Sequence, residues 1–159
     1  MPALGVVAAC ALALGTAGAT TQPLVEHMNA AREARGRAQL AIEAGLARAA
    51  DVHARSMARL GYFAHDEPDG TPFWKRILRY YPVRGYTRWQ VGENIYWSPA
   101  TPTAAKIVQT WLASPPHARV LFGNWGQVGV AVVAAKNARG VFGGRNVTIV
   151  VADFGRRTR

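Results

Sequence analysis

Three short segments of the chain place a titratable side chain among apolar or turn-forming neighbours. They contain His65 in FAHD, Glu93 in GENI and His117 in WLASPPH. The chain has only four histidines and nine acidic residues, so two histidines and one glutamate in such settings indicate a function. If these three side chains converge, they form a metal site, an acid/base site or a polar ligand pocket.

The residue types fit more than one chemistry. Two neutral imidazoles and one carboxylate are the ligand set of several catalytic zinc centres, with one position left for water. His65, His117 and Glu93 are therefore the metal-ligand candidates, with zinc as the divalent cofactor, and also the catalytic candidates. Hydrolysis without a metal is the weaker alternative, because no serine or cysteine nucleophile is evident. Ser114 lies three residues before His117, but with two prolines between them the spacing does not establish a hydrogen bond.

Each candidate also has a structural interpretation. His65 would pin a loop, and His117, after two prolines that limit its directions, would stand at a helix N-terminus. Glu93 would accept hydrogen bonds from loop backbone, since a buried carboxylate must find partners. His53 falls on or beside the apolar stripe of a helical segment, which favours a core histidine.

The elements that must position these residues follow from hydrophobic periodicity. Apolar residues at helical spacing predict two long helices, over residues 24–35 and 46–60, each followed by a glycine that ends it. The same criteria predict a turn-rich loop over 65–71, a short helix over 72–80, a buried connector or strand over 91–97, a helix over 103–113 and two strands over 128–134 and 147–152. Helices flanking a small antiparallel sheet make an α+β layered architecture.

The first nineteen residues differ from the rest. They carry no charged side chain and end in Ala17-Gly18-Ala19, a small-x-small cleavage signal. We therefore predict a signal peptide over 1–19, one globular domain over 20–159, and export to the periplasm or the cell exterior. Two alternatives are an N-terminal membrane anchor and a lipid-anchored form through Cys10, which follows a lipobox-like Val7-Ala8-Ala9.

The charge is strongly basic: 19 Lys and Arg against 9 Asp and Glu give a formal net charge of +10. The arginines are scattered from Arg32 to Arg159, and no nucleic-acid-binding motif accompanies them. This excludes nucleic acid as the main ligand. It leaves a loose attraction to anionic envelope polymers outside the cell, and we expect a monomer.

Five motifs now come in the order, and near the spacing, of a known family. They are Phe63-Ala64-His65, Gly92-Glu93-Asn94-Ile95, Trp111 followed by Ser114-Pro115-Pro116-His117, Gly129-Val130-Ala131-Val132 and Asp153-Phe154-Gly155. The chain resembles the CAP superfamily (cysteine-rich secretory proteins, antigen 5 and pathogenesis-related proteins), in its bacterial, exported SCP-domain branch. The resemblance covers about residues 24–155 and implies a three-layer α-β-α sandwich.

The resemblance also implies a cleft formed by His65, Glu93 and His117, with Pro116 where the bacterial motif has glycine. Ser114 stands where plant and animal members carry a second glutamate, so the full tetrad of two histidines and two glutamates is absent; Ser114 counts as ligand-binding. Some family members bind sterols or fatty acids, and peptidase activity is claimed for others. We expect a binding module for a small, lipidic or envelope ligand; the alternative is a metal-dependent or His-assisted, peptidase-like hydrolase outside the cytoplasm.

Overall fold

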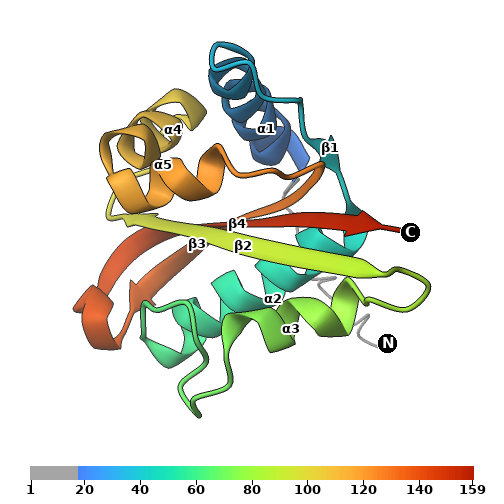
Figure 1. The fold of residues 1–159 in the computed structure, drawn as a ribbon. Helices are drawn as coiled ribbons and strands as arrows, with labels where there is room; N and C mark the ends of the chain where they lie inside the picture. The colour runs from blue at the N-terminus through green and yellow to red at the C-terminus, as the bar shows by residue number, and fades with distance from the viewer. Residues whose placement is uncertain (1–17) are drawn as a thin grey trace, which may run out of the picture.

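A computed structural model of the protein describes residues 18–159, with side chains from residue 21 onward. The expected signal peptide up to residue 17, and Cys10 with it, lie outside the described residues. Three layers of secondary structure follow, with the sheet in the middle (Figure 1). The upper layer holds α1 (Gly18–Glu33), α4 (Ala104–Ala113) and α5 (Pro115–Leu121), and the lower layer holds α2 (Ala44–Leu60) and α3 (Phe73–Tyr80).

The sheet has four strands in the order β1-β3-β4-β2. Their bounds are β1 Ala41–Ile42, β2 Arg88–Ser98, β3 Gln127–Ala138 and β4 Arg145–Thr158, and a short 3-10 turn, η1 (Gly140–Phe142), joins the last two. The three long strands pair antiparallel, and β1 pairs parallel with the start of β3. Because β2 is an edge strand, its side chains can meet residues from both helical layers at the rim of the sheet.

Alternation along β4 builds a core on each side of the sheet. Val150, Ala152 and Phe154 face the upper helices, in one cluster with Trp111. Ile149 and Val151 face the lower layer, in a cluster with α2. The continuous apolar run that predicted a strand here therefore reflects a strand covered on both faces.

The long helix α2 lies directly against β3. Glu43 caps its first turn by accepting from the backbone N–H of Leu46 at 2.7 Å, and Gly61 ends it with φ +77°. A Cβ at Gly129 of β3 would overlap the backbone of Ala47. Glycine at position 129 therefore allows the helix to approach the sheet at backbone distance.

The predicted fold class, an α+β sandwich of three layers, is confirmed. The boundaries differ in places. The helix α1 begins at Gly18, six residues before the predicted start at residue 24, and it contains Pro23. The segment 91–97 lies within the strand β2, which resolves the choice between connector and strand. Among residues 18–159 no helix is long and apolar enough to cross a membrane.

Candidate functional site

Consecutive residues of β2 connect the two helical layers at the rim of the sheet. Glu93 faces the lower layer, where its carboxylate contacts His65 and Arg76. Asn94 faces the upper layer, where its Nδ2 donates to the carbonyl oxygen of His117 at 3.0 Å. The strand alternation therefore positions the loop after α2 on one side and α5 on the other.

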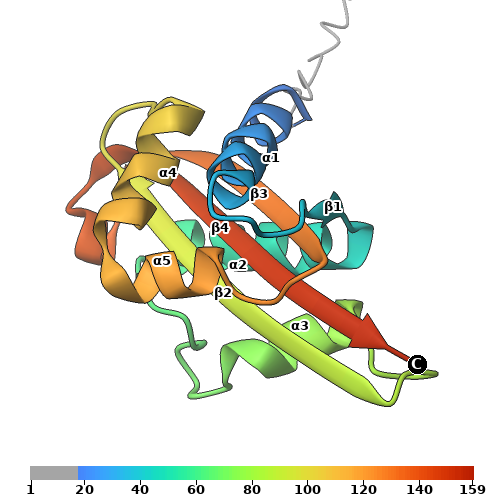
Figure 2. The same cartoon turned by 45° about the horizontal axis from the view of Figure 1, so that its top comes forward.

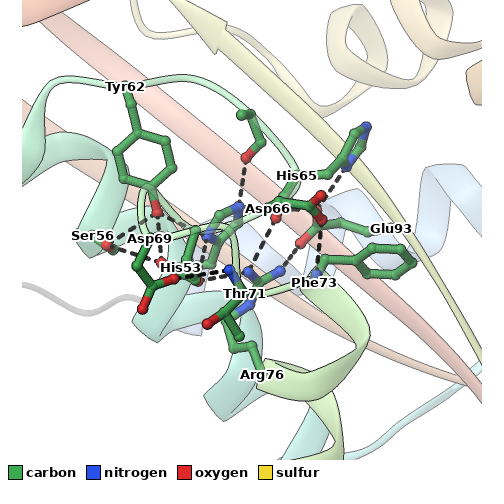
Figure 3. A network of polar contacts seen from close by, with 12 residues as sticks. His53, Ser56, Tyr62, His65, Asp66, Asp69, Thr71, Phe73, Arg76 and Glu93 are labelled. Atoms are coloured by element: carbon green, nitrogen blue, oxygen red, sulfur yellow. Dashed lines mark hydrogen bonds and ion pairs between the residues drawn. The ribbon is translucent and has the colours of Figure 1, made fainter.

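Glu93 is held through both of its oxygens. Its side chain is 1% exposed, and Oε1 lies 2.7 Å from Nδ1 of His65, while Oε2 accepts from Nη2 of Arg76. Arg76 also donates to Oε1 of Glu67 at 2.8 Å and to the carbonyl oxygen of His65 at 3.2 Å (Figure 3). With Glu93 ionised, His65 carries its proton on Nδ1, which leaves Nε2 as a hydrogen-bond acceptor.

A second histidine extends this network into the core. His53 is fully buried, and its Nε2 lies 2.9 Å from the carbonyl oxygen of Ala64. Its Nδ1 lies 3.3 Å from Oε1 of Glu67, whose other oxygen accepts from the Tyr62 hydroxyl at 2.8 Å (Figure 3). Burial lowers the pKa of His53 to about 4, so its imidazole is neutral near pH 7.

Asp153 adds a second buried carboxyl beside Glu93. It lies opposite Glu93 in the β2–β4 register and is fully buried, and neither of its oxygens accepts a hydrogen bond from a donor group. Burial raises the pKa of Asp153 well above its usual value, and the neighbouring Glu93 charge raises it further. Burial also raises the pKa of Glu93 to about 7. The more strongly raised pKa makes Asp153 the member of the pair that keeps its proton.

His117 approaches the same rim from the upper layer. Its Nδ1 lies 2.7 Å from the Ser114 hydroxyl oxygen. The two side chains therefore form the hydrogen bond that their sequence spacing alone did not establish. Ser114 is the N-cap of α5 and the prolines occupy the first two helical positions, which turns the side chain at the third position back toward the cap. Burial lowers the pKa of His117, and the nearby His65 lowers it further.

The three predicted residues thus do not converge equally. His65 and Glu93 are in direct contact, and His65 keeps 46% of its side chain exposed. His117 is close enough to His65 for their charges to interact, but among residues 21–159 no hydrogen bond joins its imidazole to His65 or Glu93. The site is a histidine–carboxylate pair with a second histidine beside it.

Comparison with known proteins shows which family has this fold. A family model described as CAP, the cysteine-rich secretory protein family, matches residues 25–154. The chain belongs to the CAP family. No curated protein sequence matches it.

Solved structures of three bacterial proteins share the fold. An extracellular protein with an SCP domain from Bacillus anthracis is 25% identical, with a TM-score of 0.62 over 85% of this chain and 39% of that one. An outer surface protein of Borrelia burgdorferi is 18% identical, with a TM-score of 0.70 over 89% of this chain and 95% of that one. A cysteine-rich secretory protein of Staphylococcus aureus is 17% identical, with a TM-score of 0.59 over 87% of this chain and 40% of that one. This chain therefore spans about two fifths of the Bacillus and Staphylococcus proteins.

Sequence reasoning missed the charged residues around Glu93 in this CAP domain. Arg76, Glu67 and Asp153 were not among the candidates, although they surround the predicted glutamate. Asp153 had a local signal, since it is the single acidic residue after Glu93 in the chain and ends the apolar run VTIVVA. The signal for Arg76 was weak, because the same eight-residue helix also contains the basic residues Lys75 and Arg79.

The arrangement does not fit the metal centre that His65, His117 and Glu93 were expected to form. Among residues 18–159, no three His, Cys, Asp or Glu side chains are placed so that they could hold one ion. Both oxygens of Glu93 are engaged, one of them by the guanidinium of Arg76. A cation at Glu93 would have to displace or adjoin that positive charge, which is unfavourable in a buried setting.

Two cavities lie near the site without including it. One of about 1040 Å³ runs along α2 and α3 and is lined by Glu67 and Arg76 among others. Another of about 430 Å³ lies beside α5. Neither is lined by His65, Glu93 or His117. The far side of the Glu93 network therefore reaches the larger cavity through Arg76, whereas the imidazoles lie at the open rim of the sheet.

Proposed function

We propose that this CAP domain is an exported binding module, and that its rim site at β2, made by His65 and His117, holds a small envelope ligand through hydrogen bonds. The contact between His65 Nδ1 and Glu93 Oε1 at 2.7 Å carries the proposal. A buried carboxylate, itself fixed by Arg76, orients the ring and keeps Nε2 free as an acceptor. Such a site favours ligands that bring donors, namely hydroxyl, amide or ammonium groups.

The charge of the chain and its relatives support a location in the cell envelope. A formal net charge of +10 attracts anionic polymers at long range and raises the local concentration of groups attached to them. The structural relatives are described as extracellular or outer surface proteins. A hydroxyl-rich component of the envelope, such as a glycan fragment, combines this location with the donor groups that the rim site would bind.

The network itself supports binding over catalysis. Hydrolysis without a metal needs a nucleophile aligned with a base, and the His65–Glu93 pair has no hydroxyl or thiol bonded to it among residues 21–159. The buried partners of Glu93 are instead arranged to hold one geometry. Binding sites use such fixed polar groups to set ligand orientation.

The test is a titration of the folded domain with defined envelope glycan fragments, followed by NMR of the histidine ring nitrogens. We expect the Nε2 resonances of His65 and His117 to shift, and His65→Ala to weaken binding by about tenfold or more, as expected for loss of a buried or oriented hydrogen bond. His27→Ala is the matched control, because His27 is exposed on α1. If the His65→Ala protein binds the fragments as tightly as the wild type and its His117 resonance shifts by the same amount, the rim site is refuted.

One contact favours the hydrolase alternative and deserves its own test. Ser114 and His117 form a serine–histidine pair at 2.7 Å, although the hydrogen bond uses Nδ1 and equally serves to orient the His117 ring at the start of α5. If the pair is catalytic, the protein will turn over members of a peptide and ester library, and Ser114→Ala will abolish the turnover. Turnover that survives in the Ser114→Ala protein, or no turnover at all, would leave the pair with a structural role only.

A further inference from the structure

Four arginines gather at one corner of the upper layer, where the end of α1 lies beside the end of α5 (Figure 2). Three of them, Arg35, Arg37 and Arg119, line the cavity of about 430 Å³. Its floor is apolar and includes Leu112, Pro115 and Phe122. The fourth, Arg32, lies buried beneath them with 1% of its surface exposed.

Arg32 fixes the two sides of this corner to each other. Its guanidinium donates to the carbonyl oxygens of Leu121 at 2.6 Å, Gly123 at 3.0 Å and Trp125 at 3.3 Å, and its Nε donates to that of Ala38 at 2.9 Å. No carboxylate pairs with it among residues 21–159. Burial lowers the pKa of Arg32, and the charge of Arg37 lowers it further. Arg32 and Arg37 are therefore close enough for their like charges to act on each other.

The three exposed arginines are placed by the local backbone. Arg35 and Arg37 flank Gly36, whose φ of +64° turns the chain so that the N–H of Arg37 donates to the carbonyl of Arg32 at 2.9 Å. The guanidinium of Arg35 lies 4.8 Å above the ring of Phe122, a cation–π contact that holds it over the apolar floor. Arg119 comes from α5 on the other side.

Nothing in the described structure neutralises these cations. Arg35, Arg37 and Arg119 form no ion pair among residues 21–159, and no carboxylate lines the cavity. On the side of α4 and α5 the sequence explains this, since it contains no Asp or Glu between Glu93 and Asp153. On the side of α1, Glu33 is close to Arg35 in the sequence but forms no ion pair among residues 21–159. Unpaired cations around an apolar hollow are complementary to a ligand with an anionic group and an apolar body.

We propose that this corner binds a small organic phosphate, whose phosphate group contacts Arg35, Arg37 and Arg119 and whose apolar part lies on Leu112 and Phe122. Guanidinium groups bind phosphate oxygens bidentately, and three of them offer more donors than a single carboxylate can accept. A cavity of about 430 Å³ lies within the range of small-ligand sites, roughly 300 to 1,000 Å³. The site is separate from the rim site of the proposed function, and its failure would leave that proposal unaffected.

The test uses the folded domain and three probes: inorganic phosphate, hexyl phosphate, and vesicles of phosphatidylcholine with and without phosphatidic acid. Isothermal calorimetry measures the soluble probes and vesicle sedimentation the lipid. We expect hexyl phosphate to bind more tightly than inorganic phosphate, because only it covers the apolar floor. Binding of hexyl phosphate would identify a soluble ligand, and binding of phosphatidic acid vesicles alone would identify a lipid headgroup; both support the site if it depends on the corner arginines.

Single substitutions decide that dependence. Arg119→Gln and Arg37→Gln should each weaken binding by about tenfold, the loss expected for one charge-assisted hydrogen-bonded contact. Arg84→Gln is the matched control, since it removes the same charge from an exposed loop position that lines neither cavity. An equal loss in the Arg84→Gln protein would reduce the effect to net charge and overturn the proposal, as would no binding of any phosphate probe at low ionic strength.

Discussion

Glu93 and Asp153 lie directly opposite each other on β2 and β4, and both carboxyl groups are buried. Arg76 forms an ion pair with Glu93 of this pair and a second one with Glu67. The folded protein therefore keeps a proton on the pair at a pH where the unfolded chain releases it. His65, which connects the pair to solvent, is held by the same carboxylate.

This relationship predicts a loss of stability at alkaline pH. The pKa of Asp153 is raised well above its usual value and that of Glu93 to about 7, so the folded state holds more protons than the unfolded state above about pH 4. The free energy of unfolding falls as the pH rises through this window, by up to about 1.4 kcal/mol per pH unit for one proton. Above pH 7 the neutral His53, with a pKa of about 4, no longer contributes to the slope.

Asp153→Asn isolates the effect, because an amide has nearly the shape of the protonated acid but does not titrate. We expect the melting temperature of the variant to fall less than that of the wild type between pH 7 and pH 9, a range that starts at the raised pKa of Glu93, about 7, and lies above the usual range of both carboxyls. Asp51→Asn, at a half-exposed site on α2, should follow the wild-type curve. Identical slopes in all three proteins would show that the pair does not hold an extra proton.

Removing Arg76 should unfold the site. Its loss leaves Glu93 and Glu67 without their cation, and breaking a buried ion pair costs about 3–5 kcal/mol. We expect Arg76→Gln to lose that much in urea unfolding, whereas Arg79→Gln, exposed on the same helix, should change by less than about 0.5 kcal/mol. Equal changes in both variants would contradict the central place of Arg76.

The close approach of α2 to β3 predicts a strict requirement for glycine. Gly129→Ala places a methyl group into the backbone of Ala47, so we expect at least about 2 kcal/mol of destabilisation from overpacking. Gly126→Ala, three residues earlier in the chain, should be tolerated, because a Cβ there meets nothing within 4 Å. A Gly129→Ala protein with wild-type stability would mean that the helix can move away from the sheet without cost.

Zinc should leave the melting temperature unchanged at micromolar concentrations. Both oxygens of Glu93 are already bonded, and the guanidinium of Arg76 stands beside them. A zinc-induced rise that disappears in the double variant His65→Ala, His117→Ala would contradict this expectation. Such a result would mean that the two imidazoles rearrange to bind the ion together.

Much of the fold could be predicted because it rests on local patterns. Periodic apolar residues and terminal glycines predicted α2 over nearly its whole length, and β-branched runs predicted β3 and β4. Local patterns failed where elements are short or depend on partners. The two-residue strand β1 exists only because it pairs with β3. The short helix α5 was anticipated only through the structural interpretation of His117, which placed it at a helix N-terminus.

The sequence by itself determined the layered fold, the family and the two residues of the site that touch, His65 and Glu93, because motifs and periodicity are carried by neighbouring residues. Only the tertiary structure decided what surrounds them. Asp153 meets Glu93 through the register of two strands that are sixty residues apart in the chain, and a register is set by the packing of the whole sheet. Arg76 and Arg32 likewise acquire their roles from carboxylates and carbonyls on distant elements, and no local pattern encodes such contacts.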